Sequence, residues 1–195
     1  MRRIDMRSIS TTRPSTGNMT PIFETNRLRI RALSLEDVSF IIELLNTPGW
    51  LQYIGDRHVR TEEQAIAYLQ NGPLKGYREQ GFGMWLVETK EEGVPIGMCG
   101  IMKREHLETP DIGFAFLPGY NGRGYAYEVA SASLSYAKEA LGIEKVAAIV
   151  LPNNAPSIKL LEKLGLIFVR TFTFPDSEEE LLLYGNEPGP EENQP

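Results

Sequence analysis

The sequence predicts a mixed α/β (α+β) fold, in which helices cover the faces of a mostly antiparallel sheet of six to seven strands. Two observations support this prediction. Three strand patterns follow one another between residues 83 and 117, and strands joined by short connections pair antiparallel. A strand, a helix and another strand then alternate between residues 112 and 151, which is typical of a parallel crossover.

The N-terminal elements are predicted from period and capping residues. In residues 26–32 the apolar Leu28 and Ile30 alternate with arginines, which indicates a strand with one buried face. Two amphipathic helices follow. They begin at Ser34 and Thr61, each of which is followed three residues later by a side chain that can complete a capping box.

The central segment is predicted to be a hairpin followed by a buried strand. Residues 83–89 and 94–102 have strand patterns, and the charged residues 90–93 between them form a turn. Residues 112–117 are apolar and aromatic, so we expect a strand with both faces covered.

The C-terminal half alternates helices and strands. A helix over 126–141 ends before a glycine, the residue preferred just past a helix C-terminus. A buried strand over 145–151 and a helix over 156–164 follow, and the chain closes with strands over 168–174 and 181–184.

Composition indicates one domain. The chain has 195 residues, 42% of them hydrophobic, and we expect a single folded unit over residues 21–186. We predict a disordered basic lead-in over residues 1–20 and a disordered acidic tail over 187–195. A single cysteine excludes a disulfide framework, and we expect no metal site and no membrane span.

Charge excludes one class of partner and favours another. The net charge is −6, although residues 1–20 alone carry +3. An acidic body argues against nucleic-acid binding and favours a cationic substrate such as an amine. We expect a cytoplasmic protein, monomeric or homodimeric. The Arg- and Ser-rich start leaves an organelle transit peptide as the alternative location.

A glycine-rich segment between a strand and a helix carries the chemistry. Gly122 and Gly124 remove two side chains beside the first turn of the helix, where backbone N–H groups lack partners. Such a turn suits a phosphate or pyrophosphate group. The segment fits neither the nucleotide-hydrolase phosphate loop nor the dinucleotide fingerprint, and a turn without a ligand is equally compatible with the glycines alone.

The surroundings of this turn resemble the GNAT superfamily of acyl-CoA-dependent N-acyltransferases, over about residues 22–185. The closest branch includes the ribosomal-protein N-terminal alanine acetyltransferases. The resemblance rests on five segments in order: E-T-N-R-L-R-I-R, P-I-G-M-C-G, D-I-G-F-A-F-L, Y-N-G-R-G-Y-A-Y-E and N-N-A-P-S-I-K-L-L-E-K-L-G.

The resemblance implies an acetyl-CoA-dependent N-acetyltransferase whose central strands splay apart around the pantetheine arm. Asn121 departs from the family's usual Gln or Arg, and Arg123 either adds charge or points to solvent. Asn154 matches the family's pantetheine-holding asparagine, with helix capping as the alternative. The cofactor-binding residues implied are Phe114, Ala115, Phe116, Leu117, Asn121, Gly122, Arg123, Gly124, Tyr125, Ala126, Asn154 and Ser157.

The resemblance also implies catalytic roles. Asp111 stands where family members often carry a glutamate base, with a solvated strand-end acid as the alternative. Leu161 replaces the tyrosine that commonly protonates the thiolate, so Ser157 becomes the candidate acid, with a structural helix-start serine as the alternative. Glu105 and His106 are candidates for the acceptor mouth.

The acceptor is expected to be a primary amine on a small molecule or a peptide N-terminus. Trp50, Tyr53 and Trp85 are candidates for an aromatic wall around it, although each is more often a core residue. The missing tyrosine leaves a second hypothesis, an acyl-CoA-binding module without catalysis.

Overall fold

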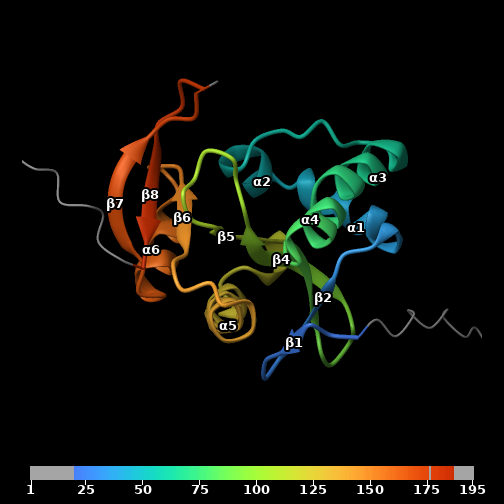
Figure 1. Cartoon of the computed structure of the whole chain (residues 1–195). Coiled ribbons are helices and arrows are strands. Elements are labelled where there is room, and N and C mark those ends of the chain that lie inside the picture. The colour runs from blue at the N-terminus through green and yellow to red at the C-terminus, as the bar shows by residue number, and fades with distance from the viewer. Residues whose placement is uncertain (1–19, 176, 187–195) are drawn as a thin grey trace, which may run out of the picture.

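The fold is a single mixed sheet with helices on both faces, seen in the computed structural model of Figure 1. Residues 20–175 and 177–186 are described. The two ends that we expect to be disordered lie outside the described residues, apart from Thr20. The predicted domain limits therefore stay predictions. The strands are β1 (Phe23–Glu24), β2 (Leu28–Ala32), β3 (Met84–Thr89), β4 (Pro95–Met102), β5 (Asp111–Phe116), β6 (Ala147–Val150), β7 (Ile167–Phe172) and β8 (Leu181–Gly185).

The sheet order is β1-β2-β3-β4-β5-β6-β8-β7, and every neighbouring pair is antiparallel except β5 and β6. The predicted mixed, mostly antiparallel fold is confirmed. The eighth strand is β1, whose two residues are too few to show a period of two.

The helices are α1 (Val38–Leu45), α2 (Pro48–Tyr53), α3 (Glu62–Asn71), α4 (Pro73–Gln80), α5 (Tyr125–Leu141) and α6 (Ala155–Lys163). Both predicted capping boxes are present. Ser34 caps a 3-10 turn (Leu35–Asp37) that leads into α1, and Thr61 caps α3. Gly142 ends α5 in the left-handed conformation, as predicted.

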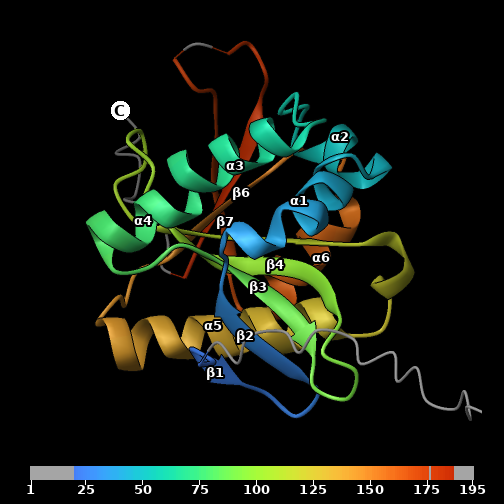
Figure 2. The same cartoon turned by 90° about the vertical axis from the view of Figure 1, so that its right-hand side faces the viewer.

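Two hydrophobic layers hold the helices on the sheet. Figure 2 shows α1 to α4 above the sheet and α5 beneath it. One core cluster joins the sheet to α5 and α6 and includes Trp85 and Leu161. The other joins the opposite face to α1, α2 and α3 and includes Leu86, Met98 and Trp50. Because both faces are covered, the central strands are nearly continuously buried. No helix in the described part is long and apolar enough to cross a membrane.

The pairing of β5 with β6 is confined to one point. Asp111 and Ala147 are their only register partners, and the Ala147 N–H donates to the Pro110 carbonyl at 2.8 Å. Beyond this contact the two parallel strands diverge, as the splay implied by the family resemblance requires. The sheet therefore contains a gap between β5 and β6 that opens toward their carboxyl ends, because the paired residues are the first of each strand.

Candidate functional site

The gap exposes backbone groups of β5. Four residues, Gly113 to Phe116, are partly exposed although they lie in the middle of the sheet. On one side β5 pairs with β4 through every residue. On the other side these four residues have no strand partner among the described residues. An extended ligand with amide groups fits such an edge, because it can take the place of the missing strand.

A loop with unused hydrogen-bond donors follows β5. Gly122 and Gly124 have φ of 73° and 79°, a conformation that side chains with a Cβ rarely adopt. Gly124 is the N-cap of α5 and supplies no side-chain cap. Within the described part of the chain, the N–H groups of residues 122–126 form no hydrogen bond. These exposed donors, together with the dipole of the 17-residue helix, suit a phosphate or pyrophosphate group.

The side chains of the loop are arranged outside this cradle. Asn121 and Arg123 are exposed. The Arg123 guanidinium lies 5.5 Å from the centre of the Tyr120 ring, which keeps it close to the loop. Tyr125 and Ala126 form the first turn of α5 and are half-buried.

A cluster that sequence reasoning missed joins the β1–β2 turn to this loop. The Arg27 Nε donates to Glu128 Oε2 at 2.7 Å, and its Nη1 donates to the Arg123 carbonyl at 3.0 Å. Thr25 and the Arg27 N–H donate to Glu128 Oε1 at 2.5 and 2.9 Å. Partial burial raises the pKa of Glu128, but these hydrogen bonds outweigh burial and hold it below its usual value.

Asp111 lies at the closed end of the gap. Its side chain is 1% exposed, so the alternative of a solvated strand-end acid is wrong. Arg104, in the loop between β4 and β5, donates from Nε to both carboxylate oxygens at 3.0 Å. Burial raises the pKa of Asp111, and the Arg104 charge lowers it only in part. The aspartate is therefore a paired, buried group with an elevated pKa.

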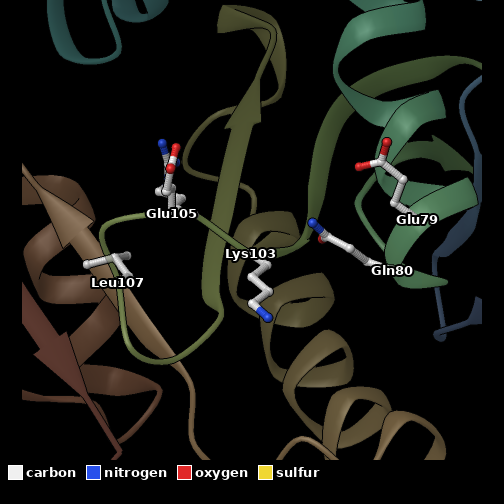
Figure 3. Close-up of a pocket in the computed structure, with 6 residues that line it drawn as sticks. Glu79, Gln80, Lys103, Glu105 and Leu107 are labelled. Carbon is white, nitrogen blue, oxygen red and sulfur yellow. The ribbon is translucent and has the colours of Figure 1, made fainter.

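A surface hollow of about 560 Å³ adjoins this pair. Figure 3 shows Glu79 and Gln80 on α4 at one side and Lys103 and Glu105 on the β4–β5 loop at the other. A second hollow of about 340 Å³ shares Glu79, Gln80, Lys103 and Arg104. Glu105 lines the hollow, and its place at an acceptor mouth stays a prediction. His106 does not line it, and its ring lies 6.2 Å from that of Phe174.

Arg104 connects the hollow to Asp111, because it lines the first and is paired with the second. Sequence reasoning passed over this arginine. The available signal was its place seven residues before Asp111 in the loop that joins two paired strands.

The residues expected across the gap begin α6. Asn154 is the N-cap, and its Oδ1 accepts from the Ser157 N–H at 3.3 Å. The half-buried Ser157 forms no hydrogen bond through its hydroxyl within the described residues. Leu161 is 2% exposed in the core, so the position of the family's usual tyrosine points into the core here. Asp111 and Ser157 lie at opposite ends of the gap, at the closed end and beyond the end of β6.

The expected aromatic wall is wrong for the two tryptophans. Trp50 and Trp85 are 6% and 2% exposed and belong to core clusters on opposite faces of the sheet. Cys99 is buried, and burial raises the pKa of its thiol to about 12, as expected of an inert core residue. Among the described residues, no group of three or more His, Cys, Asp and Glu side chains is placed to hold a metal ion.

Comparison with known proteins identifies relatives across most of the chain. Residues 27–167 match the family described as "Acetyltransferase (GNAT) domain". The uncharacterized protein YkkB of Bacillus subtilis (strain 168) is 32% identical over 151 residues, which cover 75% of this chain and 86% of YkkB. The uncharacterized N-acetyltransferase YoaA of the same organism is 31% identical over 149 residues, covering 75% and 83%.

A solved structure has the same fold. The ribosomal-protein-S5-alanine acetyltransferase from Vibrio fischeri superposes with a TM-score of 0.68, covering 84% of this chain and 94% of its own. Its sequence is 17% identical, so the likeness is one of fold.

Proposed function

The chain belongs to the GNAT acetyltransferase family, and from this premise we propose that it moves an acetyl group from acetyl-CoA to a primary amine by direct attack in a ternary complex. The observation that carries the proposal is a set of backbone groups without partners among the described residues, in two places: the edge of β5 that faces the gap, and the N–H groups of residues 122–126. The second place lies in the loop that follows β5 and on the first turn of α5. GNAT enzymes use acyl-CoA, and these two places match both parts of that molecule.

The donor would be held in two places. The pantetheine arm, which carries two amides, fits the edge of β5 over Phe114–Leu117. The pyrophosphate fits the N–H groups of residues 122–126, with Arg123 beside them. Asn154 keeps its amide Nδ2 available across the gap while its Oδ1 caps α6.

The transfer needs two proton movements. The amine nitrogen bonds to the thioester carbonyl carbon and the carbon–sulfur bond breaks, so the amine loses a proton and the thiolate gains one. We assign Asp111 to the first movement, through a water molecule at Arg104, because its carboxylate is buried behind that side chain. We assign Ser157 to the second, because its hydroxyl is not engaged within the described structure. Since Ser157 and Asp111 lie at opposite ends of the gap, they would reach the thioester from opposite sides, with the water molecule completing the path from Asp111.

The acceptor is proposed to enter through the hollow beside α4. Two acids, Glu79 and Glu105, and two bases, Lys103 and Arg104, line that hollow, and Arg104 is already paired with Asp111. The two carboxylates suit a cationic amine. The structural neighbour named above is, by its name, an acetyltransferase for an alanine of ribosomal protein S5, and we propose a peptide N-terminus and a small amine as the two candidate acceptors. A cytoplasmic location stays a prediction, and so does a monomeric or homodimeric state.

Calorimetric titration with CoA, followed by an amine panel with CoA-thiol release as the readout, tests the proposal. The wild type is expected to bind CoA, gain thermal stability from it and release thiol with at least one amine. Gly124→Val is expected to weaken CoA binding about tenfold or more, because a β-branched residue is strained at the φ of Gly124.

Gly119→Ala is the matched control. Gly119 lies in the same loop region, has open space around its Cα and has no positive φ, so its affinity should stay within about twofold of the wild type. Unchanged CoA affinity in Gly124→Val would contradict pyrophosphate binding by the N–H groups of residues 122–126. Tight CoA binding without thiol release for any amine would overturn the proposed transfer.

A further inference from the structure

We infer that Arg27 is a positioning residue for the donor, which holds the pyrophosphate loop so that its N–H groups point toward the ligand. This inference rests on the proposed function. It assigns a task to the arginine of the β1–β2 turn, which the mechanism otherwise leaves unused.

The contact geometry supports a role in orienting one peptide. The Arg27 Nη1 donates a hydrogen bond to the carbonyl oxygen of Arg123 at 3.0 Å. In a trans peptide the carbonyl and the following N–H point in opposite directions. By holding the Arg123 carbonyl, Arg27 therefore directs the Gly124 N–H away from itself, toward the open side of the loop.

Arg27 also packs against two residues at the end of the loop, Gly124 and Tyr125. Its Nη2 lies 3.4 Å from where a Cβ on Gly124 would stand, and its guanidinium lies 4.4 Å from the centre of the Tyr125 ring. Figure 2 shows the β1–β2 hairpin beside α5, the arrangement that brings Arg27 to this loop. Glu128 holds the same guanidinium at Nε, so the arginine is fixed on two sides.

The Arg27–Glu128 ion pair contributes little to the stability of the fold. The Arg27 side chain is 48% exposed, and an exposed ion pair contributes little to stability. The hairpin is already attached to α5 by an apolar contact, because the Phe23 and Tyr136 rings stack at 5.1 Å. Within the polar cluster, Thr25 and the Arg27 N–H also attach the turn to α5 through Glu128, whereas the Arg27 Nη1 reaches the loop itself.

The test compares two donors. Arg27→Gln is expected to raise the KM for acetyl-CoA roughly tenfold while the KM for the amine stays unchanged. With S-acetylpantetheine, which has no phosphate groups, the variant should match the wild type in kcat/KM. Arg27→Lys keeps the charge but cannot bridge Glu128 and the Arg123 carbonyl together, so it should restore only part of the loss.

Arg29→Gln is the control, since Arg29 lies on β2 two residues after Arg27 and pairs with Glu24 and Glu88 rather than with the loop. Its KM for acetyl-CoA should equal that of the wild type. An unchanged KM in Arg27→Gln, or an equal loss with both donors, would overturn the inference while leaving the proposed function standing. A wild type that binds no CoA would instead overturn both.

Discussion

At the scale of single residues, Asp111 combines burial, a charged partner and a place at the closed end of the gap. Removing its solvent favours the protonated form, and Arg104 favours the ionised form. The balance leaves the pKa above the ordinary value for aspartate. A base with a raised pKa accepts a proton more readily.

This balance predicts a shift in the pH profile. Activity should rise with pH as Asp111 loses its proton. Arg104→Gln removes the charge that lowers the pKa, so the acidic limb of kcat/KM should move to higher pH. Asp111→Asn should lower kcat/KM by about 100-fold or more and remove that limb. Measuring kcat/KM against pH for both variants checks the assignment.

Two further variants keep this test sharp. Arg104→Lys preserves the charge if loss of the buried pair unfolds Arg104→Gln. Lys103 lines the same hollow but is not the cation paired with Asp111, so Lys103→Gln should leave the limb in place. A limb that stays fixed in Arg104→Gln would remove Asp111 from the mechanism and leave it a structural partner of Arg104.

At the scale of elements, the N-cap residue of α6, Asn154, has two proposed roles, helix capping and cofactor binding. The Asn154 Oδ1 accepts a hydrogen bond from a backbone N–H of the helix, and within the described residues its amide Nδ2 donates to no group. Capping and cofactor binding therefore predict different substitution patterns.

Asn154→Ala should lower the free energy of unfolding by about 1 kcal/mol through the lost cap. Asn154→Ser should restore that stability, because serine is an equally good N-cap, but not the affinity for CoA, because it lacks the amide. Thermal unfolding and CoA titration of the two variants separate the effects. If Asn154→Ser regains full CoA affinity, the asparagine is only a cap.

The elements that could be predicted from sequence are those with a local signal. The capping boxes at Ser34 and Thr61 and the left-handed Gly142 depend on neighbouring residues, and all are present. The helices α2 and α4 were not predicted. Each is short and begins at a proline after a break, and neither has an amphipathic run long enough to stand out.

The parts of the site that could not be predicted are pairings across the chain. The glycine loop is local and was found from its own residues. Arg27 and Glu128 are 101 positions apart, and only the placement of the β1–β2 turn against α5 brings them together. The burial of Asp111 depends likewise on the Arg104 loop and on the single contact between β5 and β6. The exposure of Trp50 and Trp85 depends on which face of the sheet is covered, and both are covered here.

At the scale of the whole molecule, the net charge of the protein and its proposed way of binding the cofactor are independent of each other. Residues 1–20 carry +3 and residues 187–195 carry −3, so residues 21–186 hold a charge equal to the full −6 of the chain. This acidic body is proposed to bind a multiply anionic donor through uncharged N–H groups of residues 122–126. Its acidic surplus is left to act on the acceptor, and two of the acids line the hollow beside α4.

The net charge predicts how acceptor binding responds to salt. The screening length falls from about 30 Å at 0.01 M to about 8 Å at 0.15 M, so long-range attraction weakens across this range. The KM for a linear triamine should therefore rise several-fold with salt, whereas that for a dipeptide with no net charge should change by less than about twofold. Steady-state kinetics at the two ionic strengths check this, with Glu79→Gln and Glu105→Gln as local variants. If these variants abolish the salt response, the hollow itself recognises the cation; if they leave it unchanged, the attraction comes from the body as a whole. A triamine KM that is insensitive to salt would contradict a role for the acidic surface in acceptor choice.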